Sequence, residues 1–243
     1  MNIPSKYITN KMLCDHITHL YDFSVFRHLL NVVLSLIITS RLSFNVTDKR
    51  FSEQQEGLCN TSISSFYNKI LKKIIHKKNY VVTIKEMRPN VIIHECAHAI
   101  EKESALDITQ GFSAAINHDL NNLHSQNIIL QKKIQHLMVK ALESYDQKSH
   151  LPELFARYFE LFAFTKEVTD GKFSISNVSS CFKNTTKWIK NTLEPILVQK
   201  TIKEVSTYSL SNPPRKEHTT NWQRSISSNS KKSWSQRNTS LFD

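Results

Sequence analysis

"VIIHECAHAI", residues 91–100, contains the pattern His-Glu-x-x-His within an apolar stretch that is expected to be helical. His94 and His98 are four residues apart, so a helix places both imidazoles on one face, where their nitrogens can converge on one cation. Glu95 lies about 100° around the helix and is poorly placed to bind the same ion, but it can reach a water molecule bound there. This division of roles suits metal-assisted hydrolysis, in which the ion polarises a carbonyl and the carboxylate takes the proton from water.

The segments around the motif predict an α+β protein that is predominantly α-helical. "YVVTIKEM" (80–87) is rich in β-branched and aromatic residues and is the best candidate strand. Pro89 is favourable at the start of the helix that follows, expected at 91–104. The chain has only three glycines and six prolines, so few residues interrupt helices. Further helices are expected as two within 7–42 and one each at 64–78, 112–124, 125–144, 151–168 and 182–206.

Changes in composition divide the chain into three parts. Residues 1–60 are expected to form an N-terminal helical region with a polar linker from residue 42 to residue 61, and residues 61–206 the domain that carries the motif. Residues 207–243 are rich in Ser and Asn with almost no aliphatic side chains, which predicts a disordered basic tail. Within 125–144, the side chains expected to point inward are Ile128, Leu130, Ile134, Leu137, Val139 and Leu142.

The N-terminus lacks the apolar core of a classical signal peptide. The most apolar run, residues 29–39, has eleven residues, fewer than the roughly 20 that a transmembrane helix needs. We therefore expect no transmembrane segment, and a location in the cytoplasm or export by a signal-independent route. The four cysteines are scattered without a CxxC pair, so they are expected to be reduced and largely buried.

The chain is basic, with a formal net charge of +11. Lysines gather at Lys69, Lys72, Lys73, Lys77 and Lys78, and further basic residues lie in the tail. This pattern is compatible with weak association with nucleic acid or an anionic surface.

In its motif the chain resembles the zincin metallopeptidases, in which an HExxH helix follows an edge strand that pairs with an extended substrate. The resemblance implies a zincin-like core and assigns "YVVTIK" (80–85) to that edge strand. Metzincins need a glycine and a third histidine where this chain has Glu101 and Ser104, so that subgroup is excluded. The gluzincin subgroup takes its third zinc ligand from a glutamate on a later helix.

Two later segments could supply the third ligand. "ELFARYFE" (153–160) resembles the glutamate-ligand helix of lethal-factor-type toxin peptidases and similar boxes in polyvalent-protein peptidase domains. This likeness implies that Glu153 is the third ligand, with Glu160 as the next candidate, although Arg157 stands where the toxin family has an acidic residue. "NHDL" (117–120) has a suitable separation from the motif and offers His118 and Asp119, but it contains no glutamate.

The resemblance also implies a Tyr or His that stabilises the oxyanion. Tyr145 is the closer match by spacing, and His150 is the alternative. The main hypothesis is a zinc-dependent peptidase with His94, His98 and Glu153 as Zn²⁺ ligands, Glu95 as general base, and a peptide or protein as substrate. One alternative is a basic helical protein that binds nucleic acid or a membrane surface and has an incidental or inactive HExxH. Another is a zincin-like scaffold without catalysis.

Overall fold

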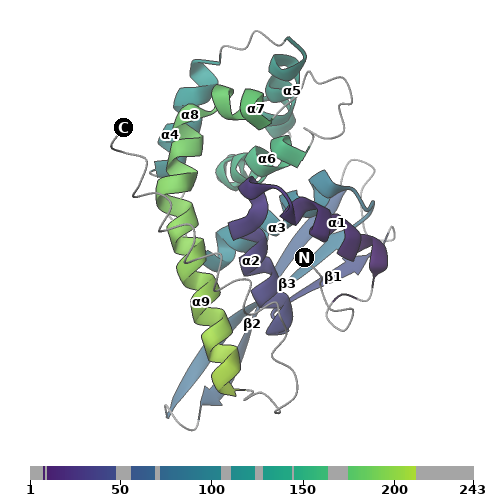
Figure 1. Ribbon diagram of the computed structural model, residues 1–243, viewed down its shortest axis with the longest axis vertical. Helices are drawn as coiled ribbons and strands as arrows, with labels where there is room; N and C mark the ends of the chain where they lie inside the picture. Colours follow the sequence, from purple (N-terminus) through teal and green to yellow (C-terminus); the bar gives the residue numbers. More distant parts are fainter. Residues whose placement is uncertain are drawn as a thin grey trace, which may run out of the picture.

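A small sheet and the helices packed on it position the HExxH segment (Figure 1). The computed structural model describes residues 8, 10–47, 56–68, 72–104, 111–123, 128–143, 145–163 and 175–211. The helices are α1 (Lys11–Tyr21), α2 (Ser24–Ile38), α3 (Pro89–Ser104), α4 (Gly111–Asn121), α5 (Ile128–Met138), α6 (His150–Ala163), α7 (Ile175–Cys181), α8 (Lys183–Trp188) and α9 (Glu194–Ser211). Short 3₁₀ turns cover Lys140–Leu142 and Gln147–Ser149, and a π-helical turn, Ile189–Leu193, joins α8 to α9. The predicted class, α+β with mostly helices, is confirmed.

The three strands of the described sheet are β1 (Leu42–Val46), β2 (Gly57–Asn68) and β3 (Lys73–Ile84), in the order β1-β3-β2. β1 runs parallel to β3, and β2 and β3 form a long antiparallel hairpin. Two sequence predictions are therefore wrong. The helix expected at 64–78 is the distal part of this hairpin, and the linker expected at 42–61 contains β1 and the first residues of β2.

The prediction that "YVVTIK" is an edge strand is also wrong, because β3 lies in the centre of the described sheet. β2 is the edge strand on the side of the HExxH helix, with which its first residues share a cleft. The pairing of β1 with β3 from Leu42↔Tyr80 to Val46↔Ile84 explains the difference, since it occupies the outer side of β3.

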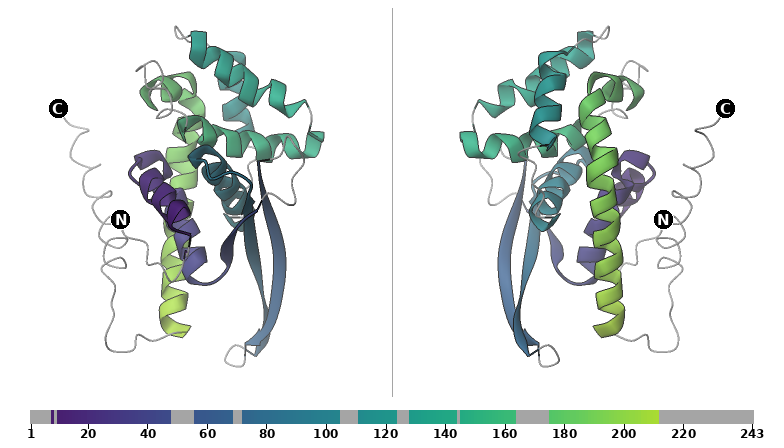
Figure 2. Two further views of the ribbon diagram at one scale, coloured as in Figure 1. Left: turned by 90° about the vertical axis from the view of Figure 1, so that its right-hand side faces the viewer. Right: turned by 90° about the vertical axis from the view of Figure 1, so that its left-hand side faces the viewer.

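The core of the protein combines residues from both sides of the predicted boundary at residue 60, which falls within β2. α2 has nine of its fifteen residues buried and lies beside the long helix α9, and α3 packs between the sheet and α6 (Figures 1 and 2). The apolar run at 29–39 lies mostly in α2. Among the described helices, none combines the length and the apolar character that a membrane span requires.

The helices predicted at 91–104, 112–124 and 151–168 correspond to α3, α4 and α6, and Pro89 is the first residue of α3. The helix predicted at 125–144 is shorter, and two of its expected inward residues are exposed: Ile128 is the first residue of α5, and Val139 follows its last. The other four, Leu130, Ile134, Leu137 and Leu142, are buried. Most of the predicted disordered tail lies outside the described residues, although α9 extends to Ser211.

A buried charge cluster holds the C-terminal end of α3. The two Arg41 terminal nitrogens donate to both carboxylate oxygens of Glu103, at 3.2 and 2.6 Å, and Tyr80 Oη donates to Glu103 Oε2 at 2.9 Å. Lys200 Nζ on α9 donates to Glu103 Oε1 at 2.9 Å, and Arg41 also pairs with Glu204. Burial alone would raise the pKa of Glu103, but the hydrogen bonds from Arg41 and Lys200 lower it below its ordinary value. The cluster therefore fixes α3 relative to the sheet and α9.

Candidate metal centre

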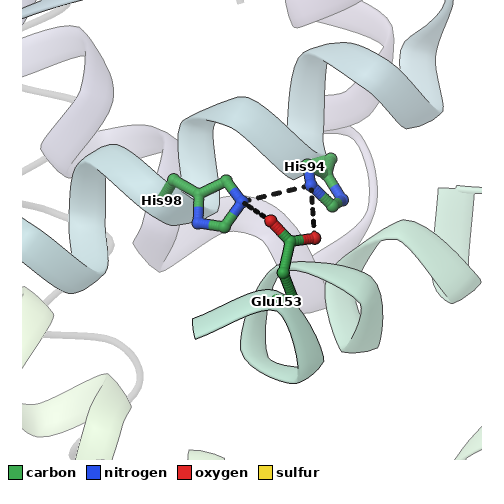
Figure 3. A group of neighbouring side chains, drawn as sticks. All are labelled: His94, His98 and Glu153. Atoms are coloured by element: carbon green, nitrogen blue, oxygen red, sulfur yellow. Dashed lines mark hydrogen bonds and ion pairs between the residues drawn. The ribbon is translucent and has the colours of Figure 1, made fainter. Parts of the chain in front are cut away.

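The side chains of His94, His98 and Glu153 point toward one another from two helices (Figure 3). His98 Nε2 lies 3.1 Å from His94 Nε2 and 3.2 Å from Glu153 Oε1, and His94 Nε2 lies 3.5 Å from Glu153 Oε2. Ligand atoms held about 2.1 Å from a tetrahedral ion are separated by about 3.4 Å. The three side chains can therefore hold a metal ion with little movement.

Helix α6 presents its acidic residue because its other face is anchored in the core. Phe155, Phe159 and Phe162 are buried, and Phe155 makes edge-on ring contacts with Phe112 and Phe159. Residues 153, 157 and 160 fall on the opposite side at helical spacing, where α6 packs on α3. Packing of the aromatic face thus sets the distance from Glu153 to the two histidines.

Glu160 and Arg157 support the three candidate ligands. His94 Nδ1 lies 3.0 Å from Glu160 Oε2, and Asn90 Nδ2 donates to Glu160 Oε1 at 3.3 Å. Arg157 lies between the two carboxylates, with Nε 3.7 Å from Glu153 Oε2 and Nη1 3.8 Å from Glu160 Oε2. Glu160, the next candidate for third ligand, thus contacts the nitrogen of His94 that faces away from His98. A carboxylate in this position fixes the ring orientation of a ligating histidine and raises its basicity.

The charges of the centre favour a cation. Burial alone would lower the pKa of His94, but its hydrogen bonds to Glu153 and Glu160 raise it to about 10. Burial lowers the pKa of His98, and the neighbouring charge of His94 lowers it further. The two histidines hold the pKa of the buried Glu153 far below its ordinary range. The buried oxygen Glu153 Oε2 has only long ion-pair contacts, to His94 Nε2 at 3.5 Å and to Arg157 Nε at 3.7 Å, and no short hydrogen bond. Such an oxygen is costly to bury and is suited to a metal ion.

Glu95 is buried next to the start of the edge strand. Its side chain is 5% exposed, and burial raises its pKa to about 7, with the charge of His94 opposing this shift. A Cβ on Gly57 would lie 2.5 Å from Glu95 Oε1, so only glycine leaves room for the carboxylate at this point of β2. Nothing in the sequence pointed to this contact, because residues 57 and 95 meet only once the hairpin has formed.

A cleft of about 700 Å³ opens over the centre. Its lining includes the three candidate ligands, Glu95, Tyr145, Arg157, Glu160, Glu56 with the first residues of β2 (Gly57 to Cys59), and the basic residues Lys133 and His136 of α5 and Lys148 of the turn Gln147–Ser149. Tyr145 is partly exposed, and its ring lies 5.9 Å from the Arg157 guanidinium carbon. The structure thus brings Tyr145 into the cleft, as an oxyanion-stabilising role would require.

The other sequence candidates lie elsewhere. His150 Nε2 bonds to the backbone oxygen of Tyr145 at 3.0 Å, and His150 is absent from the residues that line the cleft. Asp119 accepts hydrogen bonds from Thr185 and Asn184 and thereby joins α4 to α8. His118 contacts Asn184 at the same place. The "NHDL" segment therefore does not supply the third ligand, and its role is to pack two helices together.

No family model matches the sequence, and comparison with curated proteins and with solved structures finds no match either.

Proposed function

We propose that the protein is a zinc-dependent peptidase of gluzincin type. The observation that carries this proposal is the geometry of His94, His98 and Glu153, whose facing atoms lie at the separations expected around a tetrahedral zinc ion. Two histidines and one glutamate form a typical catalytic donor set that leaves one position open. Zn²⁺ held there would supply a Lewis acid that polarises a carbonyl and acidifies water.

Glu95 is the proposed general base. Its carboxylate is buried in the wall of the same cleft, and its raised pKa, about 7, lies near the range in which a carboxylate both accepts and returns a proton. It would take a proton from the attacking water and pass it to the leaving amine. Tyr145, which lines the same cleft, would donate a hydrogen bond to the oxygen of the scissile carbonyl.

The outer edge of β2, on the side away from β3, is the proposed binding site for the peptide backbone. Lys85 N donates to Glu56 O at 2.9 Å, so residues 56 and 85 form a hydrogen-bonded pair of the antiparallel ladder. Because such pairs alternate with residues whose backbone groups point outward, Gly57 and Cys59 direct theirs away from β3. Of these groups, Cys59 O accepts a hydrogen bond from Lys102 Nζ at 3.1 Å. An extended peptide that pairs with these groups would pass beside Glu95.

A chance HExxH motif would not explain the buried carboxylate from α6 or the support of His94 by Glu160. A catalytically inactive scaffold would share both features, so activity has to be tested directly. A mixed peptide library incubated with the zinc-loaded protein should be cleaved, and Glu95→Gln should reduce the rate roughly 100- to 10,000-fold without releasing zinc. Full zinc occupancy without any cleavage would favour the scaffold, and equal rates for wild type and Glu95→Gln would reject Glu95 as the base.

A further inference from the structure

The distal half of the β2–β3 hairpin, residues 63–68 and 72–78, carries an apolar surface that no described element covers. Ile63 is 67% exposed, Tyr67 60% and Ile74 61%, which is unusual for side chains of this size in one small region. Figure 2 shows the strands of this distal hairpin extending past α3, in the direction away from α6. These side chains are therefore exposed because the hairpin projects from the body of the protein, and not because the core has a gap.

The strand register places these three side chains on one face. Tyr67 is directly opposite Ile74, and Ile63 lies four residues before Tyr67 on β2, so all three point to the same side. On β3 this is the side of Tyr80, Val82 and Ile84, which are buried against the helices. One face of the hairpin is therefore covered near the body of the protein and bare toward the tip.

The opposite face combines an aromatic ring with lysine. Phe66 is 42% exposed and lies opposite Ile75, and Lys77 Nζ is 5.2 Å from the centre of the Phe66 ring. The whole segment 57–84 contains five lysines and neither Asp nor Glu. The hairpin thus has apolar side chains on both faces, and all of its Lys, Arg, Asp and Glu residues are lysines.

We propose that the distal hairpin docks on the surface of an anionic phospholipid membrane. Apolar side chains that enter the headgroup region, with neighbouring lysines that reach the phosphates, are the combination that holds peripheral proteins on such membranes. A second copy of this chain is a poorer partner, because pairing two such hairpins would bring their lysines together. Nucleic acid would satisfy the lysines but would leave Ile63 and Ile74 without apolar contacts. The proposal is independent of the metal centre.

Co-sedimentation with phosphatidylcholine vesicles, with and without phosphatidylserine, tests the proposal on the full chain. The wild type should bind the anionic vesicles far more tightly than the neutral ones. Lys73→Gln/Lys77→Gln should weaken that binding about 30-fold, roughly fivefold for each lysine. Ile63→Ser/Ile74→Ser should weaken it at least roughly tenfold. Circular dichroism should be unchanged in both variants, because all four side chains lie outside the core.

Two matched variants control for general effects of charge and hydrophobicity. Lys183→Gln/Lys190→Gln removes the same charge from exposed lysines elsewhere, and Met12→Ser/Ile202→Ser removes exposed apolar side chains elsewhere. Both should bind like the wild type. The proposal is overturned if the wild type does not bind anionic vesicles, or if the hairpin variants bind as well as their controls. It is also overturned if duplex DNA or RNA binds more tightly than vesicles and this binding depends on the lysines alone. A further contradicting result would be that the isoleucine substitutions reduce vesicle binding only because they abolish self-association of the protein.

Discussion

His94 Nδ1 lies 3.0 Å from a carboxylate oxygen of Glu160, while His94 Nε2 faces His98 and Glu153. The two nitrogens of one ring thus face different partners, and Nδ1–H donating to Glu160 leaves Nε2 free to bind a metal ion. Asn90, which lies on α3 like His94, donates a hydrogen bond to the second oxygen of Glu160. Asn90 therefore helps to fix the carboxylate that orients the His94 ring.

Glu160→Gln should weaken zinc binding by roughly 10- to 100-fold while leaving one site per chain, because the amide holds the His94 ring less firmly. Competition with a chromogenic chelator measures the affinity. Glu143→Gln removes a carboxylate of equal charge at an exposed position and should have no effect. Unchanged affinity in Glu160→Gln would show that Glu160 does not support the metal centre.

Gly57→Ala should reduce peptidase activity without reducing the zinc content. The new Cβ would lie 2.5 Å from Glu95 Oε1 and would displace the carboxylate, and a shift of about 1 Å can cost about 100-fold in rate. Gly111→Ala is the matched control, since its Cβ would meet Trp188 Nε1, away from the centre. The control should lose stability by roughly 1–3 kcal/mol but keep the activity of its folded fraction. Equal activity loss in both variants would mean that Gly57 affects only folding.

Glu103 should make the free energy of unfolding depend on acidic pH. Its pKa is lowered in the folded protein, so its stabilising contribution is complete above the unfolded value, about 4.3, and is lost as pH falls through the lower folded value. Glu103→Gln should destabilise the protein by roughly 3–5 kcal/mol at neutral pH, because Arg41 and Lys200 lose their partner. The difference from wild type should shrink below pH 4.3 in urea unfolding. A difference that does not change with pH would contradict the role given to this carboxylate.

The sequence was sufficient to predict the helices that carry the centre. The i, i+4 spacing of His94 and His98 is a local property, and the likeness of "ELFARYFE" to a glutamate-ligand helix indicated Glu153, which the structure places beside both histidines. The support of His94 by Glu160 was missed, although a signal existed, because Glu160 follows Glu153 by seven residues and so lies on the same side of α6.

The hairpin could not be predicted from local patterns. In residues 64–78 apolar side chains and lysines fit a helical repeat nearly as well as a strand repeat, and the choice depends on pairs such as Phe66↔Ile75 that form only in the folded chain. The position of β3 in the sheet depends likewise on β1, whose pairing partner lies 38 residues further along the chain. The contacts of Gly57 with Glu95 and of Arg41 with Glu103 are of the same long-range kind.

Zinc content per chain, measured by elemental analysis of purified and dialysed protein, tests the metal centre most directly. We expect about one zinc in the wild type and in Glu95→Gln, and close to none in Glu153→Ala, with Glu143→Ala as a control that keeps its zinc. A wild-type protein that takes up no zinc, or a Glu153→Ala variant that binds it as tightly as the wild type, would contradict the assignment of His94, His98 and Glu153 as a zinc site.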